Sequence, residues 1–190
     1  MFSGATSFNG DISSWNVSNV WMFHQTFENA VSFNGDISLW EVNAHDMKAM
    51  FRGATSFNQD ISNWNLSNAN TCQEMFYNAT SFNQDLSSWD VSNVSNMKKM
   101  FANATSFNQN LSNWDVSSVT DMNRMFEGAV SFNGDVSNWS LTAVTEWGTE
   151  LLFGGASNFE GIGIETWDVS NVLGMKKMFQ NATSFNQDIS

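Results

Sequence analysis

The apolar residues of this chain recur at the same relative positions about every 25 residues. Two phenylalanines stand six residues apart in each copy, as Phe76 and Phe82 do, and an Ala lies three residues after the first of them. A Trp marks each full copy, at Trp15, Trp40, Trp64, Trp89, Trp114, Trp139 and Trp167. Because a fixed period of this length is typical of stacked repeats, we predict one elongated repeat domain over residues 1–190, with about seven turns.

Within one repeat, the apolar residues follow two spacings that predict different elements. Val94, Met97, Phe101 and Ala104 lie at the spacing of one face of a short helix. In Ser81–Ser87, apolar and polar residues alternate, which is the period of a strand. A short strand and a short helix in every turn predict a right-handed α/β solenoid, with a parallel sheet on one face and helices on the other.

The Ala of each copy has two interpretations. A side chain that is small in every copy favours close approach between adjacent turns, but Ala is also a good helix former. The eight positions are Ala5, Ala30, Ala54, Ala79, Ala104, Ala129, Ala156 and Ala182.

One repeat departs from the others. Two extra residues stand between Trp139 and Phe153, and one stands between Phe159 and Trp167. Trp147 and Leu152 fall where other copies have Met. Since length changes collect in loops, we expect the packing of this repeat to be the least regular.

The polar positions form rows that the stack would align along its length. Two interpretations are open: the Asn amides hydrogen-bond along the stack while the Asp side chains cap turns, or the carboxylates bind Ca²⁺ or a polyhydroxylated or cationic partner. Asn110 interrupts the Asp row. The Asn row is Asn9, Asn34, Asn58, Asn83, Asn108, Asn133 and Asn186, and the Asp row is Asp11, Asp36, Asp60, Asp85, Asp135 and Asp188.

Two further features carry candidate chemistry. The Trp row could be a platform on which sugars stack, but a repeated large aromatic residue is more typical of a core. Asn-x-Ser/Thr triplets are glycan acceptors in secreted eukaryotic proteins. Three of them share one repeat position, at Asn78, Asn103 and Asn181.

The charge balance bears on the partners. The chain has 19 acidic and 7 basic residues and a net charge of −12. Nucleic acids need Lys and Arg to neutralise phosphates, and anionic membranes attract basic segments, so both partners are disfavoured. The pairs Lys98–Lys99 and Lys176–Lys177 share one repeat position, and we infer no basic patch.

The residue types that carry catalysis are scarce. Cys72 stands in a Met position and is expected to be a small buried hydrophobe. His24 and His45 share no repeat position and have no Cys or Asp partner at ligand spacing. Every Asp that could act as a general acid occurs in several copies, so we predict no catalytic residues, no protein-bound metal apart from the calcium alternative, and no enzyme.

No window of the sequence is apolar enough to span a membrane. No signal peptide is recognised, and neither end has the polar cap that stacked repeats normally need. We expect the chain to be a segment of a longer protein. Alternatively, the uncapped ends of different copies stack on one another to form a filament or sheath.

The turn M-F-x-x-A-T-S-F-N-Q-D-I-S-S-W-D-V-S-N-V resembles the repeat of the BspA-type leucine-rich repeat surface proteins. The resemblance is carried by Met75–Val94 and Met100–Val119, and in near-complete form by Met1–Val20 and Met125–Val144. It implies a solenoid like those of leucine-rich repeats, located on a cell surface or secreted, that adheres to protein or glycan partners. It supplies no catalytic residues.

Overall fold

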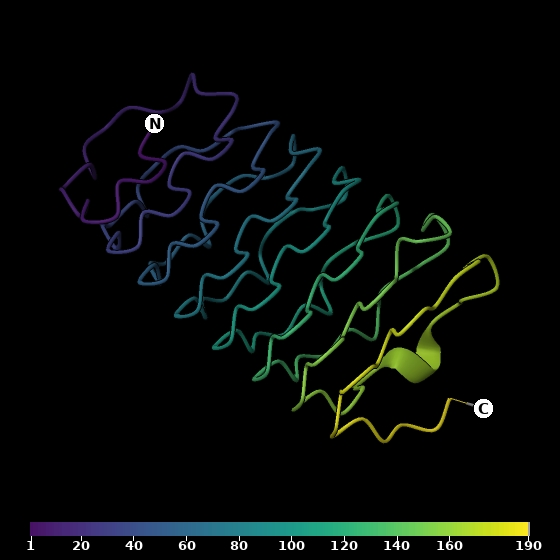
Figure 1. Ribbon diagram of the computed structural model, residues 1–190. Coiled ribbons are helices and arrows are strands. Elements are labelled where there is room, and N and C mark those ends of the chain that lie inside the picture. Colours follow the sequence, from purple (N-terminus) through teal and green to yellow (C-terminus); the bar gives the residue numbers. More distant parts are fainter. Residues whose placement is uncertain (190) are drawn as a thin grey trace.

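The chain forms a stack of coils, one for each repeat, in the computed structural model, which describes residues 1–189. Figure 1 shows that successive coils lie side by side along one axis, with the two termini at opposite ends of the elongated stack. The backbone N–H of Phe76 donates to the carbonyl of Met100 in the next coil at 2.8 Å, and similar bonds recur at each step. The coils are therefore joined by a regular ladder of hydrogen bonds.

The prediction of an α/β fold is wrong. Among residues 1–189 the only helix is the short 3-10 helix η1 (Ile164–Thr166), and no strand or sheet is formed. Adjacent coils share only isolated parallel bridges, which join Met22 to Asp46, Asp46 to Thr71, Thr71 to Asn96, and Asn96 to Asp121. Each coil is instead a succession of tight turns.

The segment predicted as a helix is a chain of turns. Lys99 and Asn103 have φ angles of 55° and 56°, in the left-handed region that no α-helix contains. The N–H of Phe101 donates to Met125 of the next coil, rather than to the residue four positions earlier in its own coil. In a series of four-residue turns, the residues that face the core recur every three or four positions, as they do in a helix. A series of turns and a helix therefore produce the same spacing of apolar residues.

The segment predicted as a strand lacks the backbone pairing of a sheet. Ser81 donates its N–H to the Thr55 carbonyl at 3.3 Å. Two residues later, the N–H of Asn83 donates to the side-chain Oδ1 of Asn58, at 2.9 Å. The alternation of apolar and polar residues correctly separates buried Phe82 from exposed Asn83, but a side chain replaces the backbone acceptor that a sheet requires.

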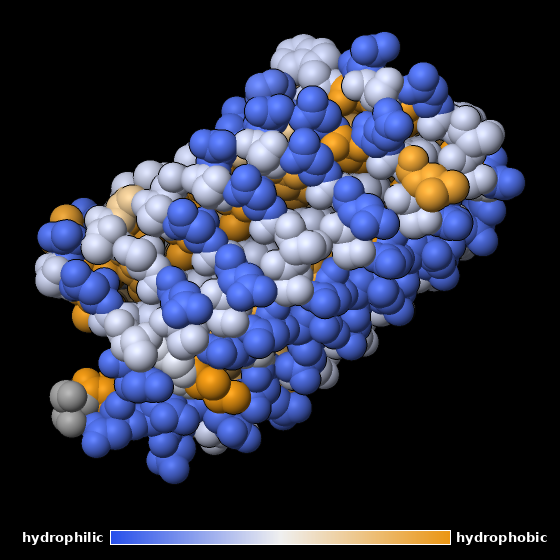
Figure 2. All heavy atoms as spheres, turned by 180° about the vertical axis from the view of Figure 1, so that it is seen from behind, coloured by the Kyte–Doolittle hydropathy of each residue, from blue (hydrophilic) through white to orange (hydrophobic). Residues whose placement is uncertain are grey.

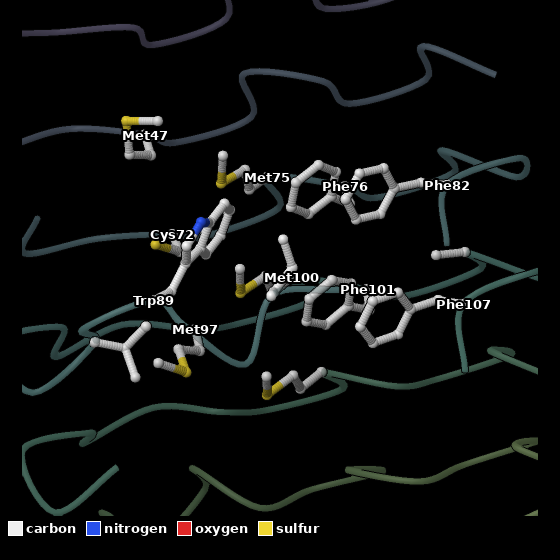
Figure 3. Close-up of a cluster of buried hydrophobic side chains, with 14 of the residues drawn as sticks. Met47, Cys72, Met75, Phe76, Phe82, Trp89, Met97, Met100, Phe101 and Phe107 are labelled. Atoms are coloured by element: carbon white, nitrogen blue, oxygen red, sulfur yellow. The ribbon is translucent and has the colours of Figure 1, made fainter. Parts of the chain in front are cut away.

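Stacked phenylalanines fill the core. The two Phe rings of one coil lie face to face, with centroids 3.9 Å apart for Phe76 and Phe82 and 4.0 Å apart for Phe101 and Phe107. Figure 3 shows these pairs repeated from coil to coil beside Met75 and Met100. Phe76 and Phe101 are 5.5 Å apart and nearly parallel. The aromatic column therefore runs through the whole stack and fixes the spacing of its coils.

The Ala residues and Cys72 confirm two details of the packing. Ala is fully buried in six copies, which favours the close-approach interpretation, and because residues 1–189 contain no α-helix, the helix-former interpretation fails. Cys72 is fully buried with a free thiol, and burial raises its pKa to about 12. A thiol that stays protonated is a weak nucleophile, so Cys72 serves only in packing.

Candidate functional site: rows of Asn and Asp along the stack

The Asn row ties each coil to the next. In the first six members of the row, from Asn9 to Asn133, the side-chain Oδ1 accepts the backbone N–H of the equivalent residue one coil later, at 2.7 to 2.9 Å. Two steps are strengthened by a Gln, because Gln84 Nε2 donates to both the carbonyl and the Oδ1 of Asn58, and Gln109 Nε2 does the same to Asn83. The interpretation that Asn side chains bond along the stack is confirmed, with a backbone N–H rather than a second amide as the donor.

The Asp row shapes a corner of every coil. Asp85 Oδ1 accepts the backbone N–H of Ser87 at 2.8 Å, which is the geometry of an Asx turn. Asn110, which interrupts the row, makes the same bond to Ser112 at 2.9 Å. The corner needs a side-chain oxygen and not a charge, so an Asn at this position leaves the turn intact. Equivalent bonds are made by Asp11, Asp36, Asp60 and Asp135.

Three carboxylates of this row, those of Asp11, Asp36 and Asp60, are held ionised by their own turns. The bonds from Ser13 lower the pKa of Asp11, and those from Ser38 lower the pKa of Asp36, since they stabilise the charged form. The neighbouring carboxylate acts in the opposite direction, because the charge of Asp11 raises the pKa of Asp36. Four consecutive members of the Asp row, Asp11, Asp36, Asp60 and Asp85, thus form a line of exposed negative charges along one edge of the stack.

Asx turns also form at two further corners, each in several of the coils. At the second corner, Asp90, Asp115 and Asp168 each accept the N–H of the Ser two residues later. At the third, Asp46 and Asp121 accept the N–H groups of Lys48 and Asn123. The sequence suggested a solvated turn at the second corner but did not reveal the third. At the third corner, some coils have Asp or Asn, but Met22 and Thr71 occupy the equivalent position in others.

The part of the chain that the structure describes contains no preformed cluster of metal ligands. Within residues 1–189, no three His, Cys, Asp or Glu side chains lie close enough together to hold an ion. The stack does bring His24 Nδ1 within 3.6 Å of Asp46 Oδ2, a pair from adjacent coils that linear spacing did not show. The calcium alternative therefore has no preformed cluster of ligands among the described residues.

The three glycosylation candidates occupy a position with a backbone requirement. Asn78, Asn103 and Asn181 have φ angles of 59°, 56° and 62°. In other coils the same position is Gly, as at Gly53 and Gly128, with φ angles of 68° and 69°. Gly and Asn are the residues that adopt this conformation most readily. The alternation of Gly and Asn is visible in the sequence and was the missed signal for this turn.

The Trp row belongs mainly to the core. Trp40, Trp64, Trp89, Trp114 and Trp139 are buried, as expected. The indole Nε1 of each donates to a carbonyl of the preceding coil, as Trp114 does to Leu86 at 2.9 Å. Trp15, in the first coil, is 43% exposed. A sugar-stacking platform along this row is excluded in the five buried copies.

Hydrophilic side chains cover much of the surface. Figure 2 shows hydrophilic side chains covering most of one side of the stack along its length, with hydrophobic groups in the gaps between them. The structure describes no helix in residues 1–189 that is long and apolar enough to cross a bilayer.

The stacked coils and their polar rows define a repeat protein. Its sequence matches the family described as "Mycoplasma protein of unknown function, DUF285" in three segments, residues 1–86, 45–151 and 148–190. Because these matches together span the chain, it belongs to that family. No curated protein and no solved structure matches the chain.

Proposed function

We propose that this chain is an extracellular or cell-surface repeat protein that binds a protein or glycan partner through its Asn and Asp rows. The observation that carries the proposal is the run of exposed carboxylates in four consecutive coils, at Asp11, Asp36, Asp60 and Asp85. No Lys or Arg pairs with them in any ion pair of the described chain. Such a line suits a partner that presents cationic or hydroxyl groups over a long surface.

The rigidity of these rows favours binding to an extended partner. Their side chains are held by Asx turns and inter-coil bonds, so little conformational entropy is lost when they are covered. The resemblance to the BspA-type surface repeats also supports adhesion. Every acidic group of the rows is repeated, which suits multivalent binding better than an active site built from unique residues.

The test removes charge without changing the turn. In the triple variant Asp36→Asn, Asp60→Asn and Asp85→Asn, each new Asn keeps the Asx turn, as Asn110 does. Binding is measured on an array of immobilised extracellular-matrix proteins and glycans. The control variant, Asp90→Asn, Asp115→Asn and Asp168→Asn, loses the same charge at a different corner.

We expect a partner that binds the wild type to lose most of its affinity for the first variant and to keep it for the control. Equal loss in both variants would show that only net charge matters. Retained binding by the first variant would remove the Asp row from the proposal. The same array with and without millimolar calcium also tests whether the ion contributes.

End-to-end assembly is a second candidate, favoured by the apolar surfaces of the first and last coils. A depression beside Phe2, Trp15 and Val20 opens at one end of the stack, and another beside Trp167, Val169 and Met175 opens at the other. A following coil, or a second copy, would cover the aromatic rings in these surfaces. Negative-stain images at high concentration test the idea, and isolated short rods would exclude it.

A further inference from the structure

The stack brings every basic residue of the chain onto one strip, which the linear sequence did not lead us to expect. This basic strip consists of the Met-Phe turns of successive coils. Backbone hydrogen bonds join these turns, such as that from the Glu74 N–H to the Lys98 carbonyl, at 2.9 Å. Its segments are residues 24–29, 48–53, 73–78, 98–103, 123–128, 150–155 and 176–181. Its basic residues are Lys48, Arg52, Lys98, Lys99, Arg124, Lys176 and Lys177.

A second row lies at the Asx corner that follows each Trp, and only some coils carry an acid there. We call it the post-Trp row. Its acidic members are Glu41, Asp90, Asp115 and Asp168. Its uncharged members are Asn16, Asn65 and Ser140. All three Asp side chains are exposed, and each accepts bonds from a Ser of its own turn.

The charges of these two rows match coil by coil. Each coil with an acid after Trp has a cation at one or both of the first two positions of its strip segment. In chain order, these cations are Lys48, Lys98 with Lys99, Arg124, and Lys176 with Lys177. The coils without an acid have none there. Their strip residues are His24 and Gln25, Gln73 and Glu74, and Glu150 and Leu151. The agreement extends to all seven coils.

Contacts within one chain do not explain this match. The ion pairs of the strip join Arg52 to Glu28 and Glu74, Arg124 to Glu127, and Lys176 to Glu150. Within residues 1–189, no ion pair joins the strip to the post-Trp row. The carboxylate of Asp115 acts on Asp90 and repels it. The match between the strip and the post-Trp row is therefore not accounted for by contacts within the chain.

We propose that copies of this protein pack side by side, parallel and in register, with the basic strip of one copy against the post-Trp row of the next. Both rows rise by one coil at each step, so a second copy matches the strip in spacing as well as in charge. When the two copies are aligned without a shift, the four acids of the post-Trp row each lie opposite a cation of the strip. The uncharged members of the row lie opposite the three strip segments that have no cation at their first two positions. The strip and the row are different surfaces, so each copy contacts two neighbours.

Single-coil shifts and the antiparallel arrangement are disfavoured by like charges. Shifting one copy by a single coil in either direction sets an acid of the post-Trp row opposite Glu74 and another opposite Glu150. An antiparallel arrangement also meets both glutamates and keeps only one matched coil. Repulsion against the wrong alignments is a recognised source of specificity. Single exposed ion pairs are weak, so the association depends on several coils acting together.

Salt defines the conditions for the test. Copies with a net charge of −12 repel one another, but screening confines this repulsion to about 10 Å at 0.1 M salt. At about 1 M salt the screening length falls to about 3 Å, and the close pairs are weakened as well. Sedimentation velocity over a range of protein concentrations at these two ionic strengths detects the association.

We expect the wild type to form larger species at the lower salt concentration and to dissociate at the higher. The variant Asp90→Asn, Asp115→Asn and Asp168→Asn should associate at least roughly tenfold more weakly. Asn16 and Asn65 show that Asn keeps this turn. The matched control, Asp36→Asn, Asp60→Asn and Asp85→Asn, should associate as the wild type does. A wild type that stays monomeric at both salt concentrations, or equal association by both variants, would overturn the proposal.

The alignment itself is tested by zero-length carbodiimide cross-linking of an equal mixture of isotope-labelled and unlabelled protein. Mixed-label peptides come only from links between copies. We expect Asp90 to be joined to Lys98 or Lys99, and Asp168 to Lys176 or Lys177. Links between copies from Asp90 to Lys48 or Lys176 would show that the coils are out of register and would contradict the proposal.

Discussion

The regular coils over residues 47–141 and the irregular coil over residues 142–167 place different residues in equivalent positions. In the regular coils, buried Met97 and Met122 open the Met-Phe turn. The N–H of Met97 bonds to the carbonyl of Asp121, the residue just before the Met of the next coil. Met122 bonds in the same way to Gly148, so the Met position of the irregular coil belongs to Thr149. Thr149 is fully buried and its hydroxyl donates to the Gly174 carbonyl. A short hydrogen-bonded side chain thus replaces a long apolar one.

This comparison corrects one residue assignment. Leu152 is buried in a Met position, as predicted, but Trp147 is 57% exposed and lies outside the core. The two extra residues after Trp139 move Trp147 out of register, and the chain places it on the surface. The insertion changes the loop while leaving the hydrogen bonds from Phe126 to Leu152 and from Gly128 to Gly154 in place.

The later insertion is accommodated in a similar way. Gly161 and Gly163 adopt φ angles of 94° and 88°, and η1 (Ile164–Thr166) follows them. Trp167 still donates its Nε1 to the preceding coil, at Val136, with a distance of 2.9 Å. The Phe153 and Phe159 rings keep a centroid distance of 3.9 Å. The contacts between coils are conserved in both regions, and the chain between them absorbs the difference in length.

The polar rows are less tolerant than the core. Glu160 replaces the row Asn, and at the next step the N–H of Asn186 reaches only the Glu160 backbone carbonyl, at 3.5 Å. Ile162, which is 40% exposed, stands where the regular coils have Asp. Both rows are therefore interrupted at the irregular coil, and the surface proposed to bind a partner does not continue through it.

The largest expected effect comes from truncating the aromatic column within the regular coils. Phe101→Ala should lower the free energy of unfolding by about 3–5 kcal/mol, because a fully buried ring is lost and a cavity remains. Phe179→Ala, in the half-buried ring beyond the irregular coil, should cost clearly less. Urea denaturation followed by Trp fluorescence measures both. Equal losses would mean that the two regions are equally well packed.

A somewhat smaller effect should come from the insertion itself. A Cβ at Gly163 would lie 2.4 Å from the Cα of Ser137, and its φ angle is strained for any other residue. Gly163→Ala should cost about 2 kcal/mol or more. At Gly155, φ is 71° but the nearest atom would be 3.6 Å away, so Gly155→Ala should cost only about 1 kcal/mol. Melting temperatures compare the two, and a harmless Gly163→Ala would contradict the close approach to Ser137.

A modest gain is expected where an ordinary residue holds a left-handed conformation. Lys99 and Lys177 have φ angles of 55° and 58°. Lys99→Gly and Lys177→Gly should each raise the free energy of unfolding by about 1 kcal/mol, since Gly has no Cβ penalty there. Lys98→Gly, at a residue without positive φ, should lower it by about 0.5–1 kcal/mol. Similar gains on both sides of the irregular coil would show that the regular turn resumes after it.

The smallest effect concerns acid. The pKa of Asp36 and that of Asp60 are lowered below the ordinary 3.8 by bonds from Ser38 and Ser62. A lowered folded-state pKa contributes stability above the unfolded value that is lost as the pH falls through the folded one. We therefore expect the protection of amides against exchange, relative to their intrinsic rates, to fall first at these corners below about pH 4, and much less at Ile162, where no carboxylate is present. A uniform loss of protection along the chain would argue against these bonds as the cause.

Much of this structure could be predicted from the order of residues. The period, the Phe and Trp core, the buried Cys72 and the Asn bonds along the stack follow from residues whose chemistry is the same in every copy. The Gly and Asn alternation at Gly53, Asn78 and Gly128 was also readable, since few other residues adopt a left-handed backbone.

Only the tertiary structure decided what the backbone does between these residues. The spacing of Val94, Met97 and Phe101 fits a helix and a chain of turns equally well. The choice depends on whether each N–H bonds within its own coil or to the next one. The same stacking placed residues from seven coils on one basic strip and brought His24 to Asp46. Sequence alone thus determined which residues are buried and how often they recur, while hydrogen bonding between coils determined the backbone and the surfaces.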